Sequence, residues 1–241
     1  MLNATKKDAS IFPYKDIVIL GNFNPHIIQT AFFRQYKVFP EQEIASAEEV
    51  AQTKQQDDNL TVEVKRFYIS PIQTILVFKT FELYVYPVRL QARLKTEADS
   101  SMVLSGLKKL FTLLPHTPVT AIGFNFQAHW KTSSGIKHQR SLFLGKSDKL
   151  VSVFGKDFSL GGRIRFEDIG AKILFETEPS ISFKDAIFCS FNFHYDIPRN
   201  SAERLLSFLP NFNKARERAT TIALSLFEKP IEIFEPGMEA K

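Results

Sequence analysis

The clearest strand pattern in this 241-residue chain reads Thr117-Pro-Val-Thr-Ala-Ile-Gly-Phe-Asn-Phe-Gln-Ala-His-Trp130. Because side chains alternate between the two faces of a strand, the apolar and polar residues separate here onto opposite sides. One side would carry Ile122, Phe124, Phe126, Ala128 and Trp130, and the other Asn125, Gln127 and His129. This pattern is typical of an antiparallel sheet that packs on a core through one face only.

A helix is predicted directly before this strand. Its apolar residues recur at helical spacing and Pro115 ends the pattern; they are Val103, Leu107, Leu110, Phe111 and Leu114. Apolar, β-branched and aromatic runs predict further strands at residues 16–21, 61–69, 73–79, 81–88, 150–154, 163–167, 171–177 and 183–195. The chain therefore mixes helices with strands that follow one another in meanders.

Three other segments complete this outline. Residues 41–60 are acidic and rich in glutamine, which predicts an exposed connection. A short helix is predicted around residues 136–144. Asn200, with Glu203 three residues later, predicts the capped start of a final helical region that Pro210 interrupts.

The two halves of the chain follow the same order of strand, helix, meander and amphipathic helix. The run Val62-Glu-Val-Lys-Arg-Phe67 followed by Thr74-Ile-Leu-Val-Phe78 is echoed by Gly162-Arg-Ile-Arg-Phe166 followed by Lys172-Ile-Leu-Phe175. We therefore predict an α+β fold with two similar halves, whose antiparallel sheets are covered by helices, as internal duplication would produce. The expected subdomains are residues 1–115 and 116–241, packed as one globular unit.

Three motifs carry a resemblance to a known family. They read Leu114-Pro-His-Thr-Pro-Val-Thr-Ala-Ile-Gly-Phe-Asn125, Ile17-Val-Ile-Leu-Gly-Asn-Phe-Asn-Pro25 and Phe191-Asn-Phe-His-Tyr-Asp196. Together they resemble an uncharacterised, sporadically distributed prokaryotic protein family. The resemblance implies no activity, substrate or catalytic residue. It does imply a gene context near mobile or defence loci for some relatives.

Composition excludes several classes of protein. With 24 phenylalanines, 10 glycines and 12 prolines, the chain is neither disordered nor collagen-like. Its single cysteine, Cys189, excludes an internal disulfide scaffold, and its strand pattern places the thiol on the apolar side. No signal sequence or membrane-spanning run is evident, so we expect a cytoplasmic protein without a membrane partner.

Familiar catalytic and cofactor motifs are not found. Gly145-Lys146-Ser147 has Arg140 where a phosphate loop needs glycine, and Gly161-Gly162 precedes a predicted strand instead of a helix. There is no Gly-x-Ser-x-Gly elbow and no His-Glu-x-x-His zinc motif. The carboxylates of Glu176 and Glu178 share a strand face but adjoin no evident pocket. We therefore predict no catalytic residue, metal site or cofactor.

One polar constellation depends on how the strands pair. Asn125, Gln127 and His129 share one strand face, and Asn192, His194 and Asp196 share the matching face of a later strand. If the two strands are neighbours, these side chains could converge on a small ligand or a divalent metal. The alternative is an ordinary solvated sheet face, which alternation alone produces and which we favour.

The excess of positive charge lies in the middle of the chain, where one aspartate faces five cations. This basic patch consists of Lys131, Lys137, Arg140, Lys146 and Lys149. Such a cluster could attract phosphates or an acidic partner, although a solvated surface is the simpler interpretation. Nucleic-acid binding stays open, but no recognised reader motif supports it.

The first functional hypothesis is a non-enzymatic cytoplasmic interaction protein with a protein partner. Homodimerisation is included, because aromatic strands over residues 78–86 could offer an edge or a face. The alternative is a nucleic-acid-associated accessory protein, in line with the defence context that the resemblance implies. A second alternative is a metal- or small-ligand-dependent enzyme that uses His129, His194 and Asp196.

Overall fold

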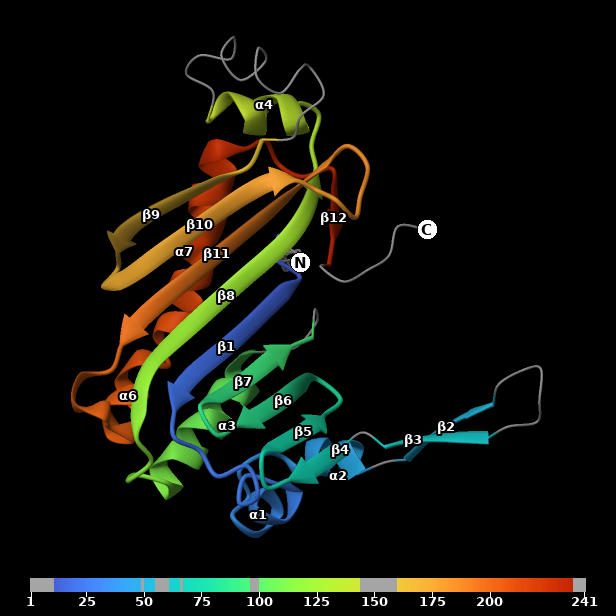
Figure 1. Ribbon diagram of the computed structural model, residues 1–241, viewed down its shortest axis with the longest axis vertical. Helices are drawn as coiled ribbons and strands as arrows, with labels where there is room; N and C mark the ends of the chain where they lie inside the picture. The colour runs from blue at the N-terminus through green and yellow to red at the C-terminus, as the bar shows by residue number, and fades with distance from the viewer. Residues whose placement is uncertain are drawn as a thin grey trace, which may run out of the picture.

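A computed structural model describes residues 11–48, 50–54, 61–65, 67–95, 100–143 and 160–235 of the chain. Ten strands within these ranges form one antiparallel sheet, in the order β4-β5-β6-β7-β1-β8-β11-β10-β9, with β12 paired to β8 (Figure 1). The strands are β1 Tyr14–Gly21, β4 Phe67–Ser70, β5 Gln73–Val77, β6 Phe81–Tyr86, β7 Arg89–Leu94, β8 Val119–Lys131, β9 Gly162–Asp168, β10 Ala171–Pro179, β11 Ala186–Asp196 and β12 Glu232–Phe234. A separate hairpin pairs β2 Val50–Lys54 with β3 Thr61–Lys65.

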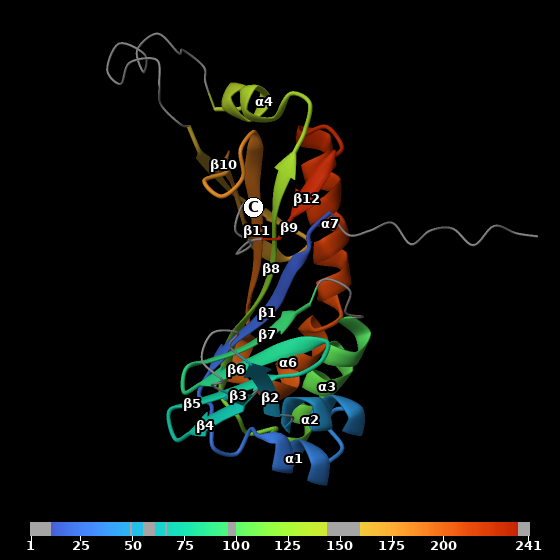
Figure 2. The ribbon, with the colours of Figure 1, turned by 90° about the vertical axis from the view of Figure 1, so that its right-hand side faces the viewer.

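Helices lie on one face of this sheet. Seen from the side in Figure 2, α3 Ser100–Leu113, α6 Ala202–Phe208 and α7 Asn211–Leu226 line the same side. The short helices α1 Thr30–Gln35 and α2 Glu41–Glu48 lie at the β4–β6 end, and α4 Gly135–Ser141 lies at the opposite end. The α+β class with an antiparallel sheet is therefore confirmed.

The amphipathic run quoted first becomes β8, the longest strand, with β1 on one side and β11 on the other. Reading outward from the β1–β8 pair, the first half of the chain contributes β7, β6, β5 and β4, and the second half β11, β10 and β9. The order of strands in one half thus mirrors the order in the other.

Phenylalanine fills the space between sheet and helices. The rings of Phe124 and Phe126 lie 5.5 and 5.4 Å from that of Phe212 on α7. At the other end of the sheet, the stacked rings of Phe78 and Phe81 are 4.2 Å apart. Burying each such side chain contributes roughly 1.5 to 3 kcal/mol. The abundance of phenylalanine is thus explained by core packing.

Helix α2 corrects the prediction of an exposed connection over residues 41–60. Ile44 and Ala47 are buried in the core, and Glu43 and Ser46 are buried too. Ser46 Oγ accepts a hydrogen bond from the Lys79 backbone N–H at 2.9 Å, and Glu43 Oε2 accepts one from that of Thr80 at 3.2 Å. The acidic composition did not reveal this helix, because its polar side chains bind backbone groups of the turn between β5 and β6. Residues 55–60 lie outside the described ranges.

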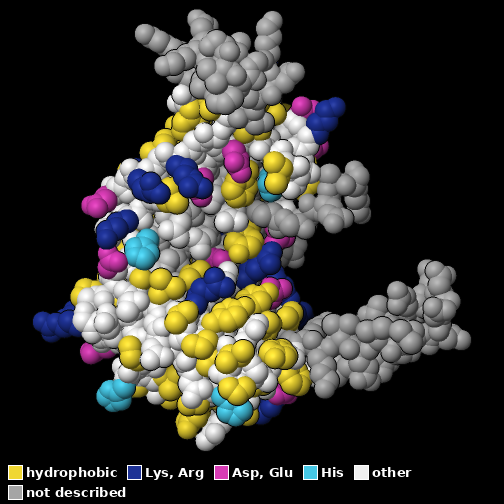
Figure 3. All heavy atoms as spheres, viewed as in Figure 1, with side chains coloured by type: hydrophobic (Ala, Val, Ile, Leu, Met, Phe, Trp, Pro, Cys, Tyr) yellow, Lys and Arg dark blue, Asp and Glu magenta, His cyan; other side chains and the backbone are white. Residues whose placement is uncertain are grey.

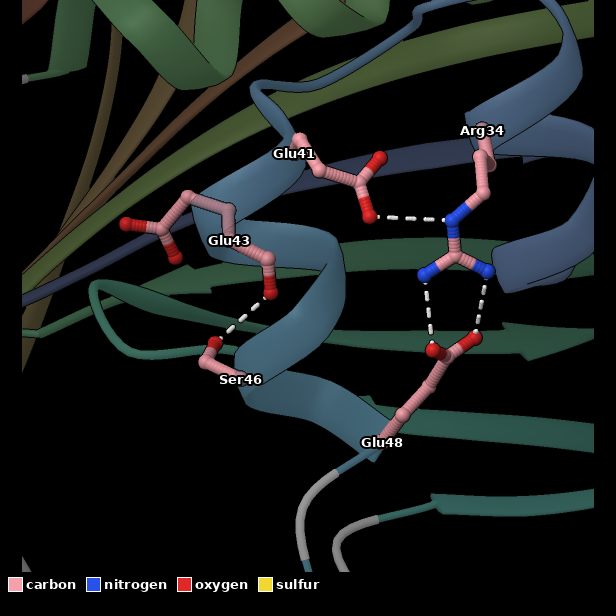
Figure 4. A network of polar contacts seen from close by, with 5 residues as sticks. All are labelled: Arg34, Glu41, Glu43, Ser46 and Glu48. Atoms are coloured by element: carbon pink, nitrogen blue, oxygen red, sulfur yellow. Dashed lines mark hydrogen bonds and ion pairs between the residues drawn. The ribbon is translucent and has the colours of Figure 1, made fainter.

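An ion pair ties α1 to α2 (Figure 4). Arg34 Nε lies 2.9 Å from Glu41 Oε1, and its terminal nitrogens bind both carboxylate oxygens of Glu48. This forked pairing lowers the pKa of the Glu48 carboxyl. The pair is exposed, so its role is to fix the geometry of the helix pair more than to stabilise the fold.

Three further sequence expectations need correction. Residues 89–94 form a strand, β7, that no pattern identified. The N-cap of α6 is Ser201, while Arg199 and Asn200 have positive φ values of 61° and 50°. Of the edge or face expected from residues 78–86, the edge is ruled out, because β6 is an interior strand between β5 and β7, whereas Tyr84 and Tyr86 do lie on a sheet face.

Candidate functional site

The sheet face opposite α3, α6 and α7, called the open face here, is the view of Figure 3. Its membership follows from strand register, since directly opposed residues share a face. The polar side chains of β8 and β11 lie on this open face, and Asn125 and Asn192 are directly opposed. β8 and β11 are neighbours, which is the condition under which the two sets of polar side chains could converge. What these polar groups can do then depends on their spacing.

The two histidines do not meet. His194 lies opposite Gly123, six positions along β8 from His129, which corresponds to about 20 Å at roughly 3.4 Å per residue. The hypothesis that His129 and His194 converge on one metal or ligand is therefore wrong. Within the described ranges, no group of three or more histidine, cysteine or acidic side chains is placed to hold a metal ion.

His129 belongs to an aromatic cluster instead. It is 6% exposed, and its ring lies 5.2 Å from that of Phe183 and 5.1 Å from that of Phe188. Burial lowers the pKa of its imidazole. Its Nδ1 is buried without a hydrogen-bond partner. The ring thus acts as a packed side chain whose surroundings disfavour its charged form.

His194 belongs to an exposed ionic group at the far end of β11. Asp196 accepts a hydrogen bond from Lys172 at 2.6 Å, and its other oxygen lies 3.1 Å from His194 Nε2. These two partners lower the pKa of the Asp196 carboxyl, the lysine contributing most. Gln127, by contrast, lies opposite Tyr14 on one side and Ser190 on the other.

Asp16 is the functional candidate that sequence reasoning missed. It is 3% exposed and lies on β1 between Arg93 and Asn125. Its Oδ2 accepts hydrogen bonds from the Tyr14 hydroxyl at 3.0 Å and from Gln91 Nε2 at 2.6 Å, and its Oδ1 accepts one from Asn125 Nδ2 at 2.5 Å. Burial raises the pKa of the carboxyl, while these three hydrogen bonds favour its charged form. The available signal was an acidic residue directly before the apolar run of residues 17–20.

Asp16 is the centre of a row of polar side chains that crosses the open face. Asn192 Nδ2 donates to Asn125 Oδ1 at 2.5 Å, which extends the network to β11. On the other side, Arg93 lies 3.9 Å from Glu82 and its guanidinium sits 4.7 Å above the Tyr14 ring. We call this set the polar row: Asn192, Asn125, Asp16, Arg93 and Glu82.

A shallow hollow of about 540 Å³ adjoins the Asn192 end of the polar row. It lies over β9, β10 and β11, and we call it the β9 hollow. The side chains that it gathers on the open face are Arg165, Glu167, Lys172, Leu174, Asn192 and His194. Two predicted site residues thus share one cavity, in company with β9 and β10 residues that no motif singled out.

The β4–β6 end of the open face is apolar. Figure 3 shows hydrophobic side chains gathered there, next to the cations of the centre. The tyrosine patch, as we define it, consists of Tyr68, Ile75, Val77, Tyr84 and Tyr86. Tyr68 is 56% exposed, and the Arg89 guanidinium lies 5.2 Å from the centre of the Tyr86 ring. Burial and the hydrogen bond to Glu82 raise the pKa of Tyr84 to about 12.

The predicted basic patch is described only in part. Lys131 lies 3.5 Å from Glu232 of β12, while Lys137 and Arg140 lie on α4. Lys146 and Lys149 fall outside the described ranges, as does Gly145-Lys146-Ser147. Nucleic-acid binding through this patch therefore stays a prediction.

Two other expectations have clear outcomes. Cys189 is fully buried, and burial raises the pKa of its thiol well above the usual range, as its apolar strand side predicted. Glu176 and Glu178 do adjoin a hollow, of about 630 Å³, which corrects the expectation that they line no pocket. Glu176 forms an ion pair with Arg163 across the β9–β10 ladder, so the two carboxylates of this hollow are not both free to act on a ligand.

In the part of the chain that the structure describes, no helix has both the length and the apolar character to cross a membrane. No protein-family model matches the sequence, and no curated protein is significantly similar to it.

Proposed function

We propose that the protein is a non-enzymatic binding module that holds a partner protein on the open face of its sheet. The single observation that carries the proposal is the tyrosine patch, an apolar area on a face that no described helix covers. An antiparallel sheet can expose one face to water, but such a face normally carries polar side chains. Contiguous exposed apolar area is typical of a protein interaction site.

The residue types of this region support a protein partner. Tyrosine and arginine are enriched at the centres of protein interfaces, where they combine large contact area with polar groups. Tyr68, Tyr84 and Tyr86 lie here, with Arg89 beside them. The surface is therefore suited to a partner that supplies apolar side chains and at least one carboxylate.

Charge favours a different protein over a second copy of this chain. Arg89 forms no ion pair with any described residue, so its guanidinium can pair with a carboxylate of a partner protein. The carboxylates nearest the tyrosine patch are already engaged, Glu82 by Arg93 and Tyr84, and Asp16 by its three donors. Among the described residues, a second copy would therefore bring no free carboxylate from this region.

The separation of His129 from His194 supports a function without catalysis, because it removes the one arrangement that suggested an enzyme. Cys189 supports it too, since a fully buried thiol of raised pKa makes a poor nucleophile. Binding through a rigid face needs neither a nucleophile nor a metal.

Site-specific photo-crosslinking in native cells tests the proposal. A photoreactive residue at Tyr84 should yield a discrete protein adduct, whereas one at Leu224, 44% exposed on α7, should not. The crosslinked protein, once purified, should bind the wild-type chain and bind Tyr68→Ser at least tenfold more weakly. Tyr36→Ser, at the exposed residue that caps the C-terminus of α1, serves as the matched control. Equal labelling from both faces, or none, overturns the proposal, and an adduct between two copies of the chain would assign a homodimer instead.

We also infer that the two halves of the chain arose by duplication. The mirrored strand order about β1 and β8 supports this. The test is superposition of β1, β7, β6 and β5 on β8, β11, β10 and β9 in an experimentally determined structure. Agreement of connectivity and backbone path supports duplication, and a register or helix placement that cannot be superposed overturns it.

A further inference from the structure

The hydrogen bonds of the polar row have a direction. The Asp16 carboxylate can only accept, so Asn125 must turn its Nδ2 toward Asp16 and its Oδ1 toward β11. Asn192 must then donate through its own Nδ2. The amide oxygen of Asn192 is left on the side of the β9 hollow, and no residue of the described ranges donates to it. A buried carboxyl group on β1 that accepts three hydrogen bonds thus decides that Asn192 offers the hollow an acceptor.

The other end of the β9 hollow carries an unpaired cation. Arg165 lies two strands from Asn192, about 10 Å away at roughly 4.8 Å per strand. It forms no ion pair with the described residues, whereas Lys172 is held by Asp196. Leu174, directly between Arg165 and Asn192, gives the hollow an apolar floor. The hollow therefore offers a cation, an apolar strip and an acceptor in line.

We propose that the β9 hollow binds an acidic peptide segment of the partner protein. A glutamate or aspartate carboxylate pairs with Arg165, the aliphatic part of the segment covers Leu174, and a backbone N–H donates to Asn192 Oδ1. The inference rests on the proposed function, because it gives the chemistry of the same partner. A carboxylate fits better than a phosphate, since Glu167 and Asp196 beside the hollow repel a dianion more strongly.

Asp16 has a distinct role in this proposal as a positioning residue. It touches no ligand, but it fixes the orientation of the Asn192 amide through Asn125. Replacing Asp16 with asparagine would allow the chain of amides to reverse, because an asparagine can donate as well as accept. The preference of the hollow for a ligand N–H should then disappear while the fold is retained.

NMR titration of the full-length protein tests the site. The probe is the capped peptide acetyl-Ala-Glu-Ala-amide, with the glutamine peptide as its match. The glutamate peptide should shift the Arg165 Nε–H and Asn192 side-chain signals in a saturable way, and the glutamine peptide should bind at least tenfold more weakly. Arg165→Gln should abolish this difference. Arg163→Gln, on the same face of β9 but paired with Glu176, should preserve it.

A second titration tests the direction of the polar row. Methylating the backbone nitrogen after the glutamate should weaken binding at least fivefold in the wild type and have no such effect in Asp16→Asn. If Asp16→Asn fails to fold, Asn192→Ala takes its place. Because this variant lacks the Asn192 acceptor, N-methylation should have no such effect on its binding either. Any of three results overturns the inference. They are equal affinity for the glutamate and glutamine peptides, NMR shifts confined to other surfaces, and an N-methyl penalty that persists in both variants. The Tyr84 crosslink reports separately on the proposed function, so either proposal can fail alone.

Discussion

The open face of the sheet differs sharply between its two ends. Around β8 and β11, asparagines and Asp16 are tied together by hydrogen bonds across neighbouring strands. Around β4 to β6, Tyr68, Ile75 and Tyr84 occupy equivalent positions on the same face. Backbone geometry is alike at both ends, so the side chains alone decide that one end specifies polar partners and the other offers apolar contact. The comparison teaches that one sheet face can carry a hydrogen-bonded polar network at one end and an apolar contact surface at the other.

The largest expected effect comes from removing the centre of the polar row. Asp16→Ala leaves three donors without their acceptor in a nearly dry site, which should lower the free energy of unfolding by about 3 kcal/mol. Urea unfolding followed by circular dichroism measures this loss. A loss below about 1 kcal/mol would mean that water satisfies these donors and that the polar row does not stabilise the fold.

A smaller effect is expected from pH at His129. Its pKa is lowered in the folded state, so the folded protein binds fewer protons than the unfolded chain. Stability from this group is therefore present above its unfolded pKa of about 6.5 and is lost as pH falls through that value toward the folded pKa. His129→Phe should flatten this decline in urea unfolding between about pH 6.5 and pH 5, and an unchanged slope would contradict the prediction.

The smallest effect on stability is expected in the tyrosine patch. Tyr68→Ser removes a side chain that is 56% exposed, so the free energy of unfolding should change by less than about 0.5 kcal/mol. The affinity of this variant for the crosslinked partner should nonetheless fall at least tenfold. A stability loss of 2 kcal/mol in the same urea experiment would show that this residue belongs to the core, and would end the contrast between the two ends of the face.

Local patterns predicted much of the fold. The run over residues 117–130 predicted β8 and the side chains on each of its faces, and the spacing from Val103 to Leu114 predicted α3. These predictions succeed because alternation and helical spacing are properties of neighbouring residues. β7 was not predicted because Arg89, Gln91 and Arg93 make its sequence resemble an exposed segment. These residues lie on the open face of an interior strand. Helix α2 was not predicted for a related reason. Its buried Glu43 and Ser46 bind backbone groups of residues that are distant in the sequence, which no local pattern reveals.

The candidate site was only half predictable. Alternation placed Asn125 with His129 and Asn192 with His194 on matching faces, but it carried no information about which residues would be opposed. Antiparallel register brought the two asparagines together and moved the two histidines apart. Asp16 entered the site from 109 residues away along the chain from Asn125.

The sequence by itself determined that this protein is an α+β protein with a phenylalanine-filled core and with polar side chains along one side of β8, because those properties depend on composition and on local periodicity. Only the tertiary structure decided that Asp16 lies at the centre of those polar side chains, that Arg165 and Asn192 share a hollow, and that tyrosines cover the far end of the same face. The physical reason is that register and strand order arise from long-range pairing, which sets neighbours across the sheet independently of their distance along the chain.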